Sequence, residues 1–162
     1  MPRPAFSLIS RVASSTAAAA MLLFAPAAHA ANCSIANVQP LRFGAYDPQL
    51  IAGLSTTGRI LFMCKNAVPA DPIRVVLDAG RNGAGGWTRQ LASGPNRLRY
   101  QLYLDPAHTL VWGDGTGGSS AWPPEGPLGQ GANQLTVYGH IPPGQFVLAG
   151  TYTDTITVTV EF

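Results

Sequence analysis

The chain has 162 residues, with 10 lysines and arginines against 8 aspartates and glutamates. Two of the arginines, Arg3 and Arg11, stand near the start, so the rest of the chain balances its acidic and basic side chains. This balance provides no basic surface for nucleic acid or for an anionic membrane, and we expect neither as a partner. The length suits one domain with a core of its own.

Residues 1–30 have the pattern of a secretory signal peptide. Arg3 and Arg11 give a basic start, the run from Val12 to Pro26 is apolar and alanine-rich, and Ala28-His29-Ala30 has the small-x-small form of a cleavage site. The run is shorter than the ~20 apolar residues of a membrane-spanning helix. We therefore expect an exported mature chain, residues 31–162, that forms one domain without a transmembrane segment.

The mature chain contains two cysteines, Cys33 and Cys64. Export places them in an oxidising compartment, so we expect one disulfide, worth roughly 3–4 kcal/mol by chain-entropy estimates. The alternative is a pair of free, buried thiols. A metal site is not expected, because the two cysteines and the distant His108 and His140 lack the spacing of a ligand set.

Five runs of the mature chain alternate apolar and polar residues with the period of two that a half-buried strand requires. A weaker run around Cys33–Phe43 precedes them and is broken by Pro40. In chain order the five are Gly58–Lys65, Ile73–Asp78, Leu98–Leu104, Leu135–Ile141 and Thr151–Phe162. No helical periodicity follows the signal peptide, and most glycines and prolines fall between the runs, as turns do. The pattern predicts an all-β antiparallel sandwich.

Two glycine-rich loops, Asp78–Pro95 and Trp112–Gln134, separate these runs and carry Trp87 and Trp122. The second loop is too long for a hairpin turn, and long loops inside compact domains are often functional. The two tryptophans are candidates for surface-binding aromatics that stack on a sugar ring or an apolar surface. The alternative is that they cap the open ends of the sandwich core.

Candidate catalytic groups are few. No serine lies in a G-x-S-x-G elbow, and neither His108 nor His140 has an evident carboxylate partner. Asp105 and Asp114 do not have the spacing of a calcium loop, and the glycines after Trp112 lack the lysine and helix of a phosphate-binding loop. We therefore expect a protein that is not an enzyme and that uses no cofactor and no metal.

The last run, Thr151–Phe162, is the most regular. Its apolar face consists of Tyr152, Ile156, Val158, Val160 and Phe162, and threonines dominate the other face. No further run follows that could form a hairpin with it. A strand without a neighbour exposes a row of N–H and C=O groups that invites pairing with another chain. We therefore expect a neighbour for this strand to come from elsewhere.

Seven short motifs follow one another from Cys33 to the last run. They are the early Cys33, Leu41-Arg42-Phe43-Gly44-Ala45-Tyr46-Asp47-Pro48, Gly58 to Cys64, Val75-Val76-Leu77-Asp78-Ala79-Gly80, Leu98-Arg99-Tyr100-Gln101-Leu102-Tyr103, Trp112-Gly113-Asp114-Gly115, and Ala149-Gly150-Thr151-Tyr152-Thr153-Asp154-Thr155. In this order they resemble the spore coat protein U domain family, the subunit type of archaic chaperone–usher pili. The resemblance implies an immunoglobulin-like sandwich that lacks its last strand and is completed by a donor strand.

The resemblance also implies a set of partners. A periplasmic chaperone would place a strand in the open groove, and at the outer-membrane usher that strand would be exchanged for one from another pilus subunit. Tyr152, Ile156, Val158, Val160 and Phe162 would then form the edge strand of the acceptor groove. The terminal carboxylate of Phe162 would be an anchor for basic chaperone residues. The implied location is a fimbrium at the cell surface, reached through the periplasm.

One feature departs from the family pattern. Cleavage after Ala30 leaves only Ala31 and Asn32 before Cys33, too few residues for a donor strand of about five. The sequence therefore favours a terminal, minor or capping subunit over an ordinary shaft subunit. Two other functions stay open: an adhesive or lectin-like module that binds a glycan or surface receptor through its loops, and a coat or matrix protein.

Overall fold

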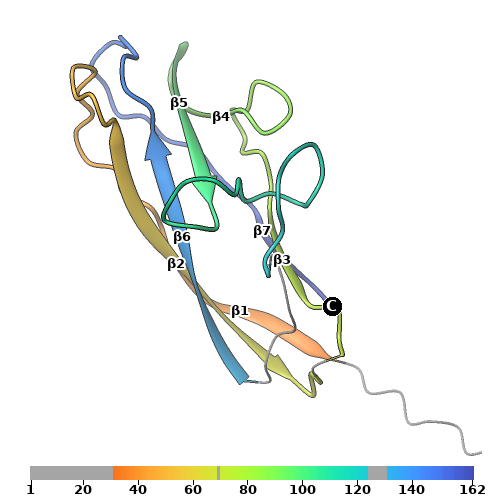
Figure 1. Ribbon diagram of the computed structural model, residues 1–162. Coiled ribbons are helices and arrows are strands. Elements are labelled where there is room, and N and C mark those ends of the chain that lie inside the picture. The colour runs from red at the N-terminus through yellow and green to blue at the C-terminus, as the bar shows by residue number, and fades with distance from the viewer. Residues whose placement is uncertain (1–30, 69, 124–130) are drawn as a thin grey trace, which may run out of the picture.

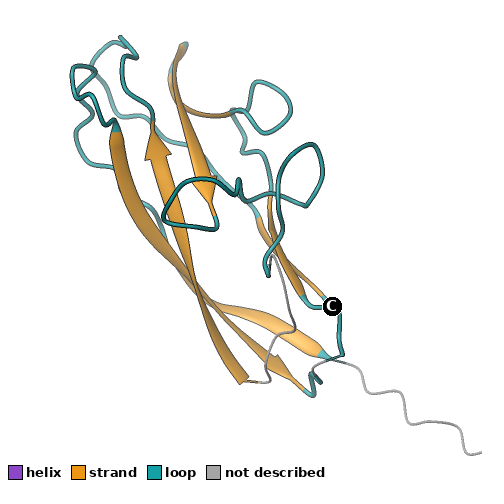
Figure 2. Ribbon diagram, viewed as in Figure 1, coloured by secondary structure: helices purple, strands orange, loops and turns teal. Residues whose placement is uncertain are grey.

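Seven β-strands and no helix make up the part of the chain that the computed structural model describes, residues 31–68, 70–123 and 131–162. The strands are β1 (Asn32–Gln39), β2 (Leu54–Lys65), β3 (Arg74–Leu77), β4 (Arg89–Ser93), β5 (Asn96–Tyr103), β6 (Gly131–Ile141) and β7 (Val158–Glu161). Figure 2 shows loops as the only other kind of structure in these residues. The expected signal peptide lies outside the described residues.

The strands form two antiparallel sheets. The larger has the order β1-β2-β6-β5-β4, and the smaller consists of β3 and β7. Figure 1 shows β2 and β6 as long neighbouring strands, with the β3–β7 pair across the core from them. A single bridge between Ala92 and Thr153 connects β4 to the segment that leads into β7. The prediction of an all-β, immunoglobulin-like antiparallel fold is confirmed.

The core follows from the alternation that the sequence displays. In β2, Ile60, Phe62 and Cys64 are buried, whereas the residues between them are half-buried or exposed. Inward residues of β3, β5 and β6 complete the same cluster. Trp112 is fully buried beside them, and its indole Nε1 donates a hydrogen bond to the carbonyl oxygen of Val75 at 3.0 Å.

The predicted disulfide between Cys33 and Cys64 is present. The two residues stand directly opposite each other in the β1–β2 ladder, so the bond links neighbouring strands of the large sheet. It therefore secures β1, an edge strand whose side chains are mostly exposed, to a strand that contributes fully buried residues to the core.

Two strands differ from the sequence-based prediction. The sequence did not predict β4, because its most buried side chain is Arg89 and it has little apolar alternation. The expected strand over residues 151–162 is continuous only in β7. Thr153 pairs with Ala92 of β4, whereas Val158–Glu161 pairs with β3, and the change of partner interrupts the ladder.

Candidate functional site

An apolar groove of about 890 Å³ lies between two segments that are far apart in the sequence. One wall is residues 38–46, where the chain leaves β1, and the other is residues 147–158, the approach to β7. The floor consists of core residues from β2, β3, β5 and β6: Ile60, Leu77, Leu98, Leu102, Val137 and Ile141. The groove therefore gives direct access to the core of the sandwich.

Two glycines allow the first wall to lie close to the sheet. A Cβ atom on Gly58 of β2 would stand 2.8 Å from the carbonyl oxygen of Gln39. A Cβ atom on Gly139 of β6 would collide with the side chains of Leu41 and Phe43. Because neither glycine has a side chain, Leu41 and Phe43 pack against the core from within a segment that has no regular ladder.

The second wall carries three of the five residues expected to form the groove edge, because Tyr152, Ile156 and Val158 line the groove. Val160, which follows this wall in β7, packs against the core but does not line the groove. Phe162 differs, because it is 58% exposed and does not belong to the core. Phe162 lies beyond Glu161, the last residue of β7 that pairs with β3, so no residue of β3 stands opposite it.

The backbone of this wall is paired on one side. Thr153 exchanges hydrogen bonds with Ala92 at 2.8 and 3.0 Å, and the carbonyl oxygens of Thr155 and Thr157 each accept a bond at 3.1 Å, from Arg81 and Asp78. Alternate residues of a strand direct their backbone groups to opposite sides. Those of Ile156, Val158 and Val160 therefore face away from β3 and β4, and no described strand pairs with that edge.

A hydrogen-bond cluster joins the first wall to the segment that precedes the second wall. The Tyr46 hydroxyl donates to the carbonyl oxygen of Pro142 at 2.9 Å and accepts from the backbone N–H of Gln145 at 3.0 Å. The side-chain amide of Gln145 in turn pairs with the backbone of Arg99 in β5, at 2.8 and 3.0 Å. The chain between β6 and the second wall is therefore held against the large sheet.

One polar pair stands among the apolar groove residues. The Tyr100 hydroxyl donates to Asp154 Oδ2 at 2.8 Å, and Asp154 Oδ1 accepts from the backbone and side-chain nitrogens of Asn82 at 3.2 and 3.0 Å. Burial raises the pKa of Tyr100, and the bond to Asp154 raises it further. Gly80 is required here, because a Cβ atom at that position would collide with the Asp154 carboxylate.

Both loop tryptophans contribute to the fold. Trp87 donates from Nε1 to the carbonyl oxygen of Thr116 at 2.8 Å, and its ring stacks on the buried guanidinium of Arg89. Trp122 packs edge-on against Phe62 and exchanges backbone hydrogen bonds with Val75 at 2.7 and 3.0 Å. These contacts agree with the core-capping alternative, and a role in surface binding stays a prediction.

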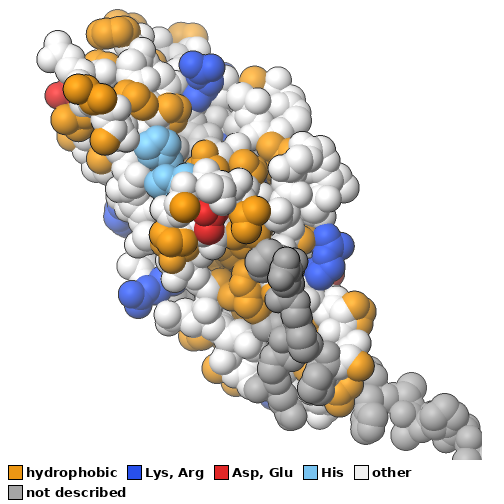
Figure 3. Space-filling view, in the orientation of Figure 1, with side chains coloured by type: hydrophobic (Ala, Val, Ile, Leu, Met, Phe, Trp, Pro, Cys, Tyr) orange, Lys and Arg blue, Asp and Glu red, His pale blue; other side chains and the backbone are white. Residues whose placement is uncertain are grey.

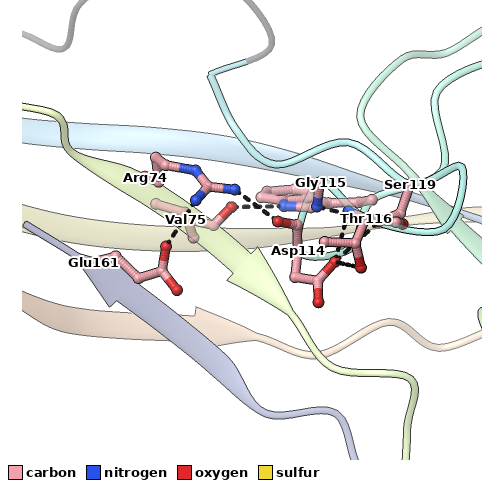
Figure 4. Close-up of polar contacts among 8 residues, drawn as sticks. Arg74, Val75, Asp114, Gly115, Thr116, Ser119 and Glu161 are labelled. Carbon is pink, nitrogen blue, oxygen red and sulfur yellow. Dashed lines mark hydrogen bonds and ion pairs between the residues drawn. The ribbon is translucent and has the colours of Figure 1, made fainter.

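The loop that follows Trp112 is tied to the end of β7 through Arg74. The Arg74 guanidinium forms an ion pair with Glu161 at 3.3 Å and donates to the carbonyl oxygen of Asp114 at 2.6 Å (Figure 4). The Asp114 carboxylate accepts from the N–H and hydroxyl of Thr116 at 2.8 and 2.7 Å, which closes the loop on itself. Asp114 therefore has a structural role that its spacing in the sequence did not reveal.

The sequence predicted an edge strand of an acceptor groove within residues 151–162, and it offered no prediction of an opposite wall. The break at Pro40 and the glycines within β2 and β6 were the only features of the sequence that pointed to this wall. Which side chains pack against those glycines depends on the tertiary structure. Among the described residues there is no cluster of three or more histidine, cysteine or acidic side chains placed to hold a metal ion. None of the described segments is a helix long and apolar enough to span a membrane.

Comparison with known proteins gives a consistent assignment. The family model for the Spore Coat Protein U domain matches residues 18–159. Protein U of Myxococcus xanthus is 32% identical over an alignment of 180 positions, which covers 93% of this chain and 96% of the relative.

A solved structure supports the fold. It is the crystal structure of the CsuC–CsuE chaperone–tip adhesion subunit pre-assembly complex from archaic chaperone–usher Csu pili of Acinetobacter baumannii. The match has a TM-score of 0.58 and 24% identity, and it covers 82% of this chain but only 40% of the matched chain. At that identity the likeness concerns the fold alone.

Proposed function

The chain belongs to the Spore Coat Protein U domain family, and we propose that it is an exported structural subunit of a chaperone–usher pilus. Its groove accepts a β-strand from another protein, and its role is assembly rather than catalysis. The observation that carries this proposal is the coincidence of an apolar groove with a backbone edge that pairs with no strand among the described residues. Export through the periplasm to a surface fimbrium follows from the same role.

The chemistry of the groove suits an extended peptide with alternating apolar residues. Backbone groups of Ile156, Val158 and Val160 are oriented to extend the small sheet by one strand. Apolar side chains of the added strand would cover the floor between the two walls and also Val38 of the first wall, which is 47% exposed. Main-chain bonds would then supply affinity, and the side-chain pockets would supply specificity.

The first partner in this scheme is a periplasmic chaperone, followed at the usher by a strand from another subunit. The matched structure is a pre-assembly complex of a chaperone with a pilus subunit, and a chaperone as the first partner of this chain agrees with it. A transient strand from the chaperone would protect the exposed core until assembly. This protection matters because an uncovered apolar edge is prone to aggregation.

Periplasmic expression with and without the chaperone of the same gene cluster tests this proposal. We expect the wild-type chain to be soluble only as a one-to-one complex, as judged by size-exclusion chromatography. Val158→Asp places a carboxylate in the groove and should abolish the complex, since burying an unpaired charge is strongly unfavourable. The matched control, Thr159→Asp on the exposed face of the same strand, should form it normally.

A stable wild-type monomer without the chaperone would contradict the proposal, because the sandwich would then close without a donor. Equal loss of complex in the Val158→Asp and Thr159→Asp variants would show that charge on the strand, rather than groove burial, decides the outcome.

A finer proposal concerns the position in the pilus. With cleavage after Ala30, Ala31 and Asn32 are the residues available before β1 continues at Cys33, so the chain accepts a strand without donating one. We place it as a terminal or minor subunit. Mass spectrometry of the exported protein tests this, and an N-terminus several residues upstream of Ala31 would restore a donor segment and overturn the placement.

A further inference from the structure

Two histidines that are distant in the sequence lie together on the surface outside the groove. His140 belongs to β6, and His108 belongs to the loop after β5. Their ring centroids are 5.0 Å apart with an interplanar angle of 30°, and Tyr103 covers His108 at 4.9 Å. Figure 3 shows the two imidazoles as adjacent pale-blue patches on one face of the molecule.

The loop around His108 is built to hold its side chain in place. His108 has a φ of 59°, a left-handed conformation that is uncommon for a residue other than glycine. The Asp105 carboxylate fixes the loop by accepting from the N–H and hydroxyl of Thr109 and from the N–H of Leu110, at 2.7–3.1 Å. This network positions the His108 ring between Tyr103 and His140.

The second imidazole is oriented by Ser55 of β2, whose hydroxyl oxygen lies 3.0 Å from His140 Nδ1. In the tautomer that donates from Nδ1 to this oxygen, Nε2 of His140 keeps its lone pair. In metal-binding histidines the second ring nitrogen commonly donates to an oxygen atom, which fixes the tautomer and the ring orientation; the Ser55 hydroxyl oxygen is placed to act in this way.

We propose that His108 and His140 form a two-imidazole site for a divalent transition metal ion of the zinc class. With Zn–N bonds of about 2.0–2.1 Å and tetrahedral angles, two bound rings have centroids roughly 5 Å apart, as this pair does. Imidazole is also a preferred ligand of Cu²⁺ and Ni²⁺. The described residues supply two ligands, so water or a group from another molecule completes the coordination.

Zinc titration by calorimetry at pH 7.5 tests the site, using tag-free protein in the form in which it accumulates in the periplasm. We expect one saturable Zn²⁺ per chain in the wild type and none in His108→Gln or His140→Gln. Ala107→Gln, the same new side chain at an exposed position of the same loop, should bind like the wild type. Ser55→Ala keeps both imidazoles and should weaken binding about tenfold.

If His140→Gln does not accumulate, His108→Gln alone decides the question, because His108 lies in a surface loop. Any co-purified chaperone is titrated separately and its signal subtracted. Absence of one-to-one binding by the wild type, or unchanged binding in His108→Gln, would overturn the proposal. Neither result would affect the groove, since the histidines do not line it.

Discussion

Strand β2 and the segment from Thr151 to Phe162 show the same apolar alternation but have different environments. β2 lies between β1 and β6 and buries Ile60 and Phe62 completely. The C-terminal segment pairs only with β3 and β4, and Ile156 and Val158 stay half-buried beside the groove. Alternation therefore specifies which side chains of a strand turn inward, whereas the depth of their burial depends on how many neighbours the strand has.

The largest expected effect on stability distinguishes β2 from the C-terminal segment directly. Phe62→Ala should lower the free energy of unfolding by about 3–5 kcal/mol, because it leaves a cavity in a fully packed core. Val158→Ala should cost less, because it removes a smaller side chain that is half-buried beside the groove. Urea unfolding of the wild type and of both variants, each as its complex with the chaperone, measures the two costs. Equal costs for Phe62→Ala and Val158→Ala would contradict this difference in burial between the two regions.

The second test concerns the disulfide, because it secures the β1–β2 side of the molecule and not the C-terminal segment. Replacing Cys33 and Cys64 by serine should cost about 3–4 kcal/mol, since the unfolded chain regains its loop entropy. Denaturant melts of the double variant and of the oxidised wild type, each as its complex with the chaperone, give this difference. The affinity for a donor peptide should change little in the variant that remains folded, and a large loss would show that β1 and the groove are coupled.

The smallest expected effect concerns the bond between Tyr100 of the large sheet and Asp154 of the open wall. Tyr100→Phe should cost about 1.5–3 kcal/mol, as for a hydrogen bond to a charged group. The folded state raises the pKa of Tyr100 above its ordinary value of 10.0, so this contribution is complete below pH 10 and is lost as the pH rises further.

Urea melts between pH 8 and pH 11 check the sign of this effect. The wild type should lose stability above pH 10 more steeply than the Tyr100→Phe variant. Identical pH profiles would indicate that Tyr100 ionises freely in the folded state.

The sequence predicted the strands that bury one face and predicted less well those that depend on polar partners. β2, β5 and β6 were correctly expected because their inward residues are apolar at every second position. β4 was missed because Arg89 is buried, with its guanidinium satisfied by the carbonyl oxygens of Asp78 and Trp112. A charged side chain is buried in a core only where hydrogen-bond acceptors surround it, and the sequence alone does not show where such acceptors come together.

The sequence alone determined the inward faces of the main strands and the disulfide, because period-two alternation and a single pair of cysteines need no knowledge of neighbours. The tertiary structure decided the opposite wall of the groove, where Leu41 and Phe43 lie on Gly58 and Gly139. It likewise brought His108 to His140, although the sequence offered no ligand spacing. Both juxtapositions involve residues that lie outside the strands, and their contacts depend on chain packing rather than on sequence separation.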